Sequence, residues 1–175
     1  MIKELLKSDY EGYPLTFSYT TSFYYEVVIQ GSIDHCQIEL NKKPFDHEIT
    51  KSFDAKLFEP YYENAVAFGI FDEDILAAII EVNKEDWSNR LRITELLVLE
   101  EYRRQGYGHR LMEKVKDYAN QTGVRAIILE TQSRNSKAIA YYLKEGFTII
   151  GLDTICYGNK DIENKEVRLE FGFLL

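Results

Sequence analysis

The sequence predicts an α+β fold with a mixed, twisted β-sheet, formed by an antiparallel meander and then a βαβαβ arrangement, with helices on both faces. Three apolar runs, residues 65–71, 75–82 and 91–99, are separated by polar turns, which is typical of a meander. Strand and helix patterns then alternate as far as Asp153. The chain of 175 residues has no internal repeat or flexible linker, so we expect one domain over residues 1–175.

The first third of the chain carries less regular patterns. Aromatic and β-branched residues in 23–40 predict one or two strands with a break near Gly31. Residues 46–58 place four apolar side chains at a spacing that fits one helical face, and Pro60 follows them, so we expect a helix there. These four residues are Ile49, Phe53, Leu57 and Phe58.

The second half alternates regularly between strands and helices. The expected elements are a helix over 108–122, a strand over 125–131, a helix over 136–145, a strand over 147–153 and a last strand over 167–175. Gly123 follows the first helix as a stop signal. Asn135 is a candidate N-cap for the second helix, and Gly146 follows its end.

Composition limits the function classes. The net charge of −8 argues against a nucleic-acid-binding groove and favours a small cationic partner. No apolar stretch approaches the roughly 20 residues that a membrane helix needs, and the first residues lack the features of a signal peptide. The two cysteines, Cys36 and Cys156, have no metal-binding or redox spacing. We therefore expect a cytoplasmic protein without a metal site or a membrane partner, either a monomer or a homodimer.

A glycine-containing turn joins the strand that ends at Leu99 to the next helix. Gly106 and Gly108 lack Cβ atoms where the backbone must approach a ligand, and the first helical N–H groups there have no intrahelical acceptor. Arg103 and Arg104 add positive charge, which makes a pyrophosphate the natural occupant. The turn lacks the Gly-Lys-Ser/Thr of a P-loop and the third glycine of a dinucleotide fingerprint. Taken alone, it is equally an ordinary glycine turn.

Together with a second motif, this turn resembles the GNAT (Gcn5-related) N-acetyltransferase superfamily. Arg103, Gly106 and Gly108 match the Gln/Arg-x-x-Gly-x-Gly/Ala motif of that family. The family's Asn-x-x-Ala...Tyr-x-x-x-Gly-Phe segment is matched by Asn135, Ala138, Tyr142, Gly146 and Phe147. The resemblance covers residues 65–155 and implies that acetyl-CoA is the co-substrate and that an amine receives the acetyl group.

A narrower resemblance points to the streptothricin acetyltransferases, which modify the β-lysine amine of that antibiotic. It rests on Trp87, Ser88, Asn89, Leu129, Glu130, Thr131, Gln132, Gly151, Asp153, Thr154, Tyr157 and Asn159. The N-terminal third, where acceptor specificity usually resides in the family, matches only around residues 23–31. Another small amine, a protein or peptide amine, and a non-catalytic acetyl-CoA-binding module therefore stay open as alternatives.

The resemblance also implies how the co-substrate is bound. The strand backbone at Leu97, Val98 and Leu99 would pair with the pantetheine arm, and Asn135 would hydrogen-bond this arm besides capping its helix. Backbone amides would hold the pyrophosphate, and they belong to Arg103, Arg104, Gln105, Gly106, Tyr107, Gly108 and His109.

Three groups are expected to carry the chemistry. Tyr142 matches the family's acid, which protonates the departing thiolate, unless it is only a helix-face aromatic residue. The Val98 N–H would stabilise the oxyanion. Glu95 is the candidate base, because alternation places it on the opposite strand face from Val98. If that face is wrong, Glu81 or Glu130 would serve.

The acceptor amine is expected to bind a cleft lined by aromatic rings and carboxylates, which suit an ammonium group. The same residue types are common in structural roles. The candidates are Tyr24, Tyr25, Asp153, Thr154 and Tyr157.

Overall fold

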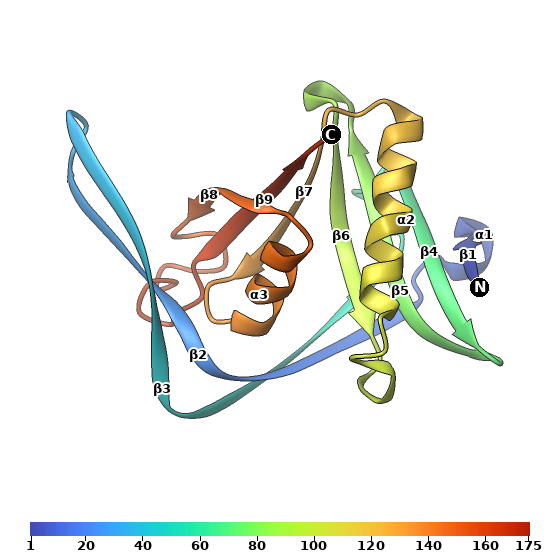
Figure 1. The fold of residues 1–175 in the computed structure, drawn as a ribbon, viewed down its shortest axis with the longest axis horizontal. Helices are drawn as coiled ribbons and strands as arrows, with labels where there is room; N and C mark the ends of the chain where they lie inside the picture. Colours follow the sequence, from blue (N-terminus) through green and yellow to red (C-terminus); the bar gives the residue numbers. More distant parts are fainter. The chain divides into compact units, whose positions relative to one another are not determined.

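The computed structural model describes residues 1–175, and the chain divides into two compact units (Figure 1). The first unit comprises Met1–Phe17, Phe53–Leu129 and Phe173–Leu175, and the second comprises Ser18–Ser52 and Glu130–Gly172. The single domain expected over residues 1–175 stays a prediction.

An antiparallel meander forms most of the first unit. Its strands are β1 (Ile2–Leu5), β4 (Ala65–Asp72), β5 (Ile75–Glu85) and β6 (Arg90–Val98), in that spatial order. β7 (Ala126–Gln132) follows β6 in parallel orientation, with Arg90 opposite Ala126. The sheet is therefore mixed, as predicted, and β4, β5 and β6 coincide with the three apolar runs. β1 and the short helix α1 (Lys7–Tyr10) lie in a segment whose pattern predicted no element.

Helix α2 (Tyr107–Thr122) lies along one face of this meander in Figure 1. Leu111, Met112, Val115 and Ala119 recur at helical spacing and are fully buried. Burying a side chain of the size of Leu or Met contributes about 1.5–3 kcal/mol. Tertiary packing of this stripe therefore stabilises α2 more than its intrinsic helix propensity does.

Side chains on the opposite face of the meander form a separate core. The Phe68 ring packs against Tyr118 of α2 at a centroid distance of 5.6 Å, so the neighbouring Ala67 points to the other face. The buried members of this core are Leu5, Leu15, Leu57, Phe58, Ala67, Leu76, Ile79 and Leu97. The chain segments on either side of residues 18–52 thus cover the sheet face that α2 does not.

The second unit contains a strand pair and a helix. β8 (Thr148–Asp153) pairs antiparallel with β9 (Arg168–Leu174). Helix α3 (Ser136–Lys144) begins after Asn135, whose Oδ1 accepts a hydrogen bond from the Ala138 N–H at 3.2 Å. The cap, the helix and the two strands agree with the expected positions to within a residue.

A long hairpin is formed by β2 (Pro14–Ser32) and β3 (His35–Lys56). The strand character expected for residues 23–40 is confirmed, with the reversal between the two strands a few residues beyond the expected break at Gly31. Gly31 itself has a φ of 99°, and a Cβ there would lie 1.9 Å from the His35 carbonyl oxygen. Only glycine fits this turn.

The helix predicted over residues 46–58 is wrong, because residues 46–56 belong to β3. Short polar side chains form a cross-strand ladder, in which the Thr20 and Thr50 hydroxyls lie 2.8 Å apart and the Ser22 hydroxyl donates to Glu48 at 2.9 Å. These contacts repeat every second residue, as strand pairing requires. Pairing with β2 outweighs the apolar spacing, since helix propensity is a weak preference that tertiary contacts override.

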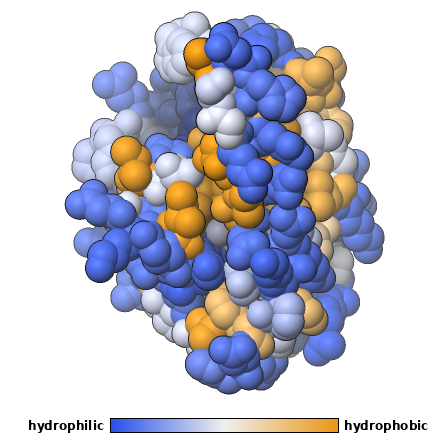
Figure 2. All heavy atoms as spheres, turned by 90° about the vertical axis from the view of Figure 1, so that its left-hand side faces the viewer, coloured by the Kyte–Doolittle hydropathy of each residue, from blue (hydrophilic) through white to orange (hydrophobic).

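The surface of the protein is rich in charged groups. Figure 2 shows a face that is mostly hydrophilic, with apolar side chains in small groups. This agrees with a composition in which 29% of the residues are charged. None of the helices combines the length and the apolar character that crossing a membrane requires.

Candidate functional site

The turn between β6 and α2 is held by its own hydrogen bonds. It opens with the 3-10 helix η2 (Glu100–Tyr102). The Arg103 side chain folds back, and its Nε donates to the Val98 carbonyl at 3.1 Å. Arg104 and Gly106 then adopt positive φ angles of 62° and 82°, which turn the chain into α2.

Helix α2 starts without a side-chain cap. Gly106 occupies the N-cap position, and the first turn contains no acidic residue. The first intrahelical hydrogen bond runs from the Arg110 N–H to the Gly106 carbonyl at 3.0 Å. The preceding amides, those of Tyr107 and Gly108, therefore have no acceptor within the helix. α3 differs, because Asn135 caps it. The positive end of the α2 dipole and these donors suit an anion.

The space beside Gly106 is open. No heavy atom of the rest of the chain lies within 4 Å of the position that a Cβ would occupy. The loop keeps its shape through contacts elsewhere: the Tyr102 and Tyr107 rings stack at 5.9 Å, and the Gln105 amide donates to the Glu101 carbonyl at 2.9 Å. The start of α2 is thus held in place by these contacts, while no other part of the chain packs against Gly106.

A β-bulge lies in β6, upstream of this turn. Glu81 stands opposite Glu95, whereas Val82 stands opposite Ile93, so Thr94 is an extra residue. Residues directly opposite each other in an antiparallel pair point to the same face. Glu81 and Glu95 therefore share a face.

These two carboxylates differ in exposure. Glu81 is fully buried, and it accepts hydrogen bonds from the Phe58 N–H at 2.6 Å and from the Thr94 hydroxyl at 2.7 Å. Burial raises the pKa of Glu81, and the two hydrogen bonds oppose that rise. Glu95 is only half-buried. A bound amine can therefore approach Glu95 more readily than Glu81.

The backbone of β6 changes its partners along the strand. β7 pairs with residues from Arg90 to Arg92, whereas β5 pairs as far as Val98. The Leu99 N–H donates to the Ala77 carbonyl at 3.0 Å. Since hydrogen-bonded pairs alternate in an antiparallel ladder, the Val98 N–H points away from β5. It is directed to the side of β6 on which the pairing with β7 has already ended.

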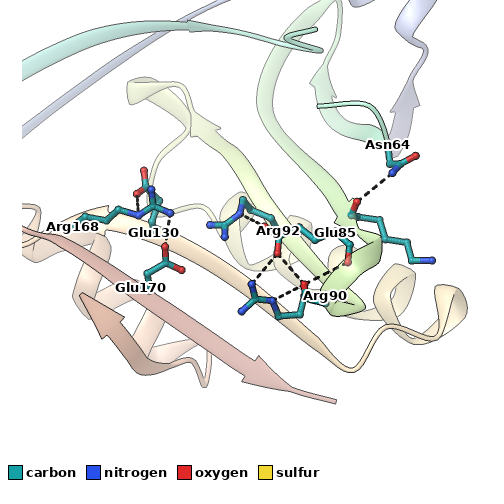
Figure 3. A network of polar contacts seen from close by, with 9 residues as sticks. Asn64, Glu85, Arg90, Arg92, Glu130, Arg168 and Glu170 are labelled. Atoms are coloured by element: carbon teal, nitrogen blue, oxygen red, sulfur yellow. Dashed lines mark hydrogen bonds and ion pairs between the residues drawn. The ribbon is translucent and has the colours of Figure 1, made fainter. Parts of the chain in front are cut away.

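Glu130, the remaining candidate base, belongs to an ion-pair network of the second unit (Figure 3). Its carboxylate accepts a hydrogen bond from the Tyr157 hydroxyl at 3.1 Å and pairs with Arg168 Nε at 2.5 Å. Arg168 also pairs with Glu170. Burial, and then the Glu130 charge, raise the pKa of Tyr157. These contacts give Glu130 a structural role.

A second network in Figure 3 supports the turn between β5 and β6. Glu85 accepts hydrogen bonds from Arg90 at 2.9 Å and from Arg92 at 2.6 Å. Although burial alone would raise it, the guanidinium groups hold the pKa of Glu85 below its ordinary value. This network was not predicted from the sequence. The signal that could have indicated it is the acidic residue before the polar turn and the two arginines after it.

Asn135 and Tyr142 lie in the second unit. Tyr142, on α3, is half-buried, and its ring lies 6.3 Å from the Phe147 ring and 5.9 Å from the Phe171 ring. Asn135 is confirmed as a helix cap. Their roles toward a co-substrate stay predictions.

The residues expected to line an amine cleft have structural partners of their own. The Tyr24 ring lies under the Lys165 ammonium group, at 5.3 Å. Asp153 Oδ1 accepts a hydrogen bond from the Ile155 N–H at 2.9 Å. Tyr25 and Thr154 are half-buried. A role for these residues in binding an acceptor stays a prediction.

Tyr61 and Tyr62, whose hydroxyl groups are within the electrostatic influence of Glu95, were not predicted from the sequence as site residues. Burial, and then the neighbouring Tyr61 and Glu95, raise the pKa of Tyr62 to about 12. The adjacent tyrosines after Pro60 were their signal, but the chain has 13 tyrosines, so this signal carried little weight.

The fold and the site define a class of protein. The chain combines a mixed sheet, a strand whose last amide points away from its neighbour, and an uncapped helix start that suits an anion. The chain matches the model of the Acetyltransferase (GNAT) family over residues 34–147, and it belongs to this family. The resemblance seen in the two motifs is therefore confirmed.

Two relatives with similar sequences are streptothricin acetyltransferases. The chain is 31% identical to streptothricin acetyltransferase of Escherichia coli over 107 residues, which is 61% of each chain. It is 29% identical to streptothricin acetyltransferase A of Bacillus subtilis (strain 168) over 103 residues, which is 59% of each chain. The matched segments thus span about three fifths of these relatives.

Solved structures share the fold over the full length. Nourseothricin acetyltransferase superimposes with a TM-score of 0.78 at 24% identity, covering 99% of this chain and 97% of that one. A putative streptothricin acetyltransferase from Bacillus anthracis str. Ames, solved in complex with acetyl coenzyme A, has a TM-score of 0.72 at 22% identity, covering 100% and 99%. The predicted α+β GNAT architecture is confirmed.

Proposed function

We propose that this chain is an acetyl-CoA-dependent N-acetyltransferase. Its acceptor is a primary amine of a small cation, with the β-lysine amine of streptothricin as the first choice. The observation that carries the proposal is the uncapped start of α2 behind Gly106, in a chain of the GNAT family. The names of the two curated relatives support the choice of acceptor.

The diphosphate of acetyl-CoA suits the start of α2. Amides of the segment from Arg103 to His109 would hold it, with the open space beside Gly106 allowing close approach. The Arg103 guanidinium bonds to the Val98 carbonyl, so Arg103 contributes mainly by fixing the loop. The backbone from Leu97 to Leu99, together with Asn135, would bind the pantetheine arm.

Three residues divide the acetyl transfer. Glu95 takes a proton from the ammonium group, directly or through one water, which leaves a neutral nucleophilic amine. The nitrogen attacks the thioester carbonyl, and the Val98 N–H stabilises the oxyanion that forms. The C–S bond then breaks, and Tyr142 donates its phenolic proton to the departing thiolate. The second proton of the former amine nitrogen passes to the Tyr142 phenolate, directly or through water, which leaves a neutral amide and restores the phenol.

Thiol release from acetyl-CoA, measured across a panel of amines, tests this proposal. The panel contains streptothricin, polyamines, aminoglycosides and peptides. We expect turnover with streptothricin at the highest kcat/KM. Preferred turnover with another amine would contradict the acceptor assignment. Tight acetyl-CoA binding without turnover on any amine would contradict the catalytic function and favour a non-catalytic binding module.

A further inference from the structure

The segment that follows β3 is anchored beside the two facing carboxylates of β5 and β6. Leu57 and Phe58 are buried, and Phe58 adopts a φ of 57°, which is uncommon for a bulky residue. The Phe58 N–H donates to Glu81 at 2.6 Å, which holds this strained backbone on the sheet. The Tyr62 N–H then donates to the Glu59 carbonyl at 2.9 Å and closes a turn.

This turn presents two aromatic rings. The Tyr61 and Tyr62 rings meet edge to face, with centroids 4.6 Å apart and an angle of 62° between their planes. Tyr61 remains 71% exposed, whereas Tyr62 is half-buried. A partly buried ring beside an exposed one offers two π surfaces that a cation can contact together.

The surroundings of the two rings are acidic. Glu59, Glu81 and Glu95 all lie close enough to act on the hydroxyl of Tyr61 or Tyr62. Arg92 is the opposing charge near Tyr62, but its Nε bonds to Glu85 at 2.6 Å (Figure 3). The field at the rings therefore favours a positive ligand.

The position of the base decides where the acceptor amine binds. An alkylamine is protonated at neutral pH, with a pKa near 10.4 as in lysine, so the enzyme must first bind an ammonium ion. A general base must lie within about 3 Å of the proton that it removes, or one water away. If Glu95 is that base, the ammonium group lies next to Glu95, on the sheet face to which the Phe58–Glu81 hydrogen bond anchors the segment that carries Tyr61 and Tyr62.

We propose that Tyr61 and Tyr62, together with Glu95, form the subsite that binds the ammonium group of the acceptor. This inference rests on the proposed acetyltransferase function. The two rings and the carboxylate bind the cation, and Glu81 positions the rings through Phe58. A subsite of this kind selects amines whose ammonium group is unhindered enough to touch two ring faces.

Paired substitutions at Tyr61 separate ring contact from other effects. Tyr61→Leu removes the ring, Tyr61→Phe keeps it, and neither disturbs a buried residue. One cation–π contact is worth about 0.5–2 kcal/mol, so Tyr61→Leu should raise the KM for streptothricin roughly 2- to 30-fold. Tyr61→Phe should stay near the wild type, and both variants should keep the KM for acetyl-CoA.

Trp87→Leu is the matched control. Trp87 is 85% exposed and already has the Arg90 guanidinium over its ring at 5.4 Å. It should leave both KM values unchanged. The subsite is overturned if Tyr61→Leu leaves the KM for streptothricin unchanged, or if Trp87→Leu raises it equally. An equal rise in the KM for streptothricin in Tyr61→Phe would also overturn the subsite, because the hydroxyl would then be responsible rather than the ring.

A binding measurement keeps this inference distinct from the proposed function. Titration of β-lysine amide, followed by NMR of ring-labelled tyrosine, should shift the Tyr61 and Tyr62 signals in the wild type. If no amine supports thiol release but these shifts occur, the transferase function fails and the cation subsite stands. If turnover is normal and Tyr61→Leu changes neither KM nor the titration, the subsite fails and the function stands.

Discussion

At Glu81, two hydrogen bonds hold a carboxylate that has no exposed surface. Across the strand pair, Glu95 has the same chemistry and a half-exposed position. The difference arises from Phe58, whose buried backbone covers Glu81. One carboxylate therefore serves to anchor a chain segment, and the other is suited to exchange protons with a ligand.

Glu81 should make stability depend on pH. Burial raises the pKa of Glu81, so the folded state binds its proton more tightly than the unfolded state. The corresponding stability is complete below the unfolded pKa of about 4.3, and it is lost as the pH rises through the folded value. Glu81→Gln cannot ionise, and its amide can still accept from Phe58 and donate to Thr94. Urea unfolding at pH 4 and pH 8 should show that the wild type loses stability relative to Glu81→Gln. An equal stability difference at both pH values would refute this role.

Glu95→Gln tests the proposed base. Loss of a general base typically lowers the rate 10²- to 10⁴-fold. We expect this loss in kcat for streptothricin, with acetyl-CoA affinity unchanged in calorimetry. Glu130→Gln is the comparison, because Glu130 bonds to Tyr157 and Arg168 and should affect stability more than kcat. A full loss in Glu130→Gln and none in Glu95→Gln would reverse the assignment.

Tyr142→Phe removes a hydroxyl and keeps the ring that packs near Phe147 and Phe171. The fold should therefore be preserved. If Tyr142 donates the proton to the thiolate, kcat should fall on the order of 10²-fold with acetyl-CoA binding retained. Undiminished kcat, in conditions where the chemical step limits turnover, would remove Tyr142 as the acid.

The elements of the second half follow closely from sequence patterns. In α2 the apolar stripe that includes Leu111 and Val115 has the helical period, and Gly123 marks its end. The loop motif at Gly106 also lies where its glycines indicated. These signals are local, because helix faces, caps and glycine turns are set by residues close in sequence.

Elements of the first half depend on distant partners. Residues 46–56 form a strand because polar residues such as Thr50 pair with β2, about thirty positions earlier. The Tyr61–Tyr62 turn depends on the contact of Phe58 with Glu81. No local pattern specifies such contacts, so neither the extension of the hairpin through residues 46–56 nor the anchoring of the Tyr61–Tyr62 turn could be derived from the sequence.

The two glycines that flank α2 give a matched pair of substitutions. Gly106 has a φ of 82° and Gly123 a φ of 66°, and no heavy atom lies within 4 Å of a Cβ at either position. Alanine at either position should therefore lower the free energy of unfolding by about 1–2 kcal/mol through backbone strain. Gly106→Ala should also weaken acetyl-CoA binding at least tenfold, whereas Gly123→Ala, at the opposite helix end, should not. Calorimetric titration and thermal unfolding measure both effects, and equal acetyl-CoA affinities in the two variants would place the diphosphate elsewhere.

For the whole molecule, the net charge and the family membership both agree with the proposed acetyl transfer. The net charge of −8 would favour the cationic acceptor that we propose, while the α2 start would favour the diphosphate of the proposed co-substrate. The proposed function thus makes two opposite electrostatic demands on one chain. The acetyl transfer that we propose for this member of the GNAT family would use both.

Mass spectrometry of streptothricin incubated with acetyl-CoA and the protein tests the central claim most directly. We predict a product heavier by one acetyl group, attached at the β-lysine amine, with one free coenzyme A thiol released per product. A mixture in which streptothricin keeps its mass, while the same protein sample transfers the acetyl group of acetyl-CoA to a different amine and releases the free thiol, would contradict that acceptor. Unchanged streptothricin and intact acetyl-CoA, with every amine supplied, would contradict the account as a whole.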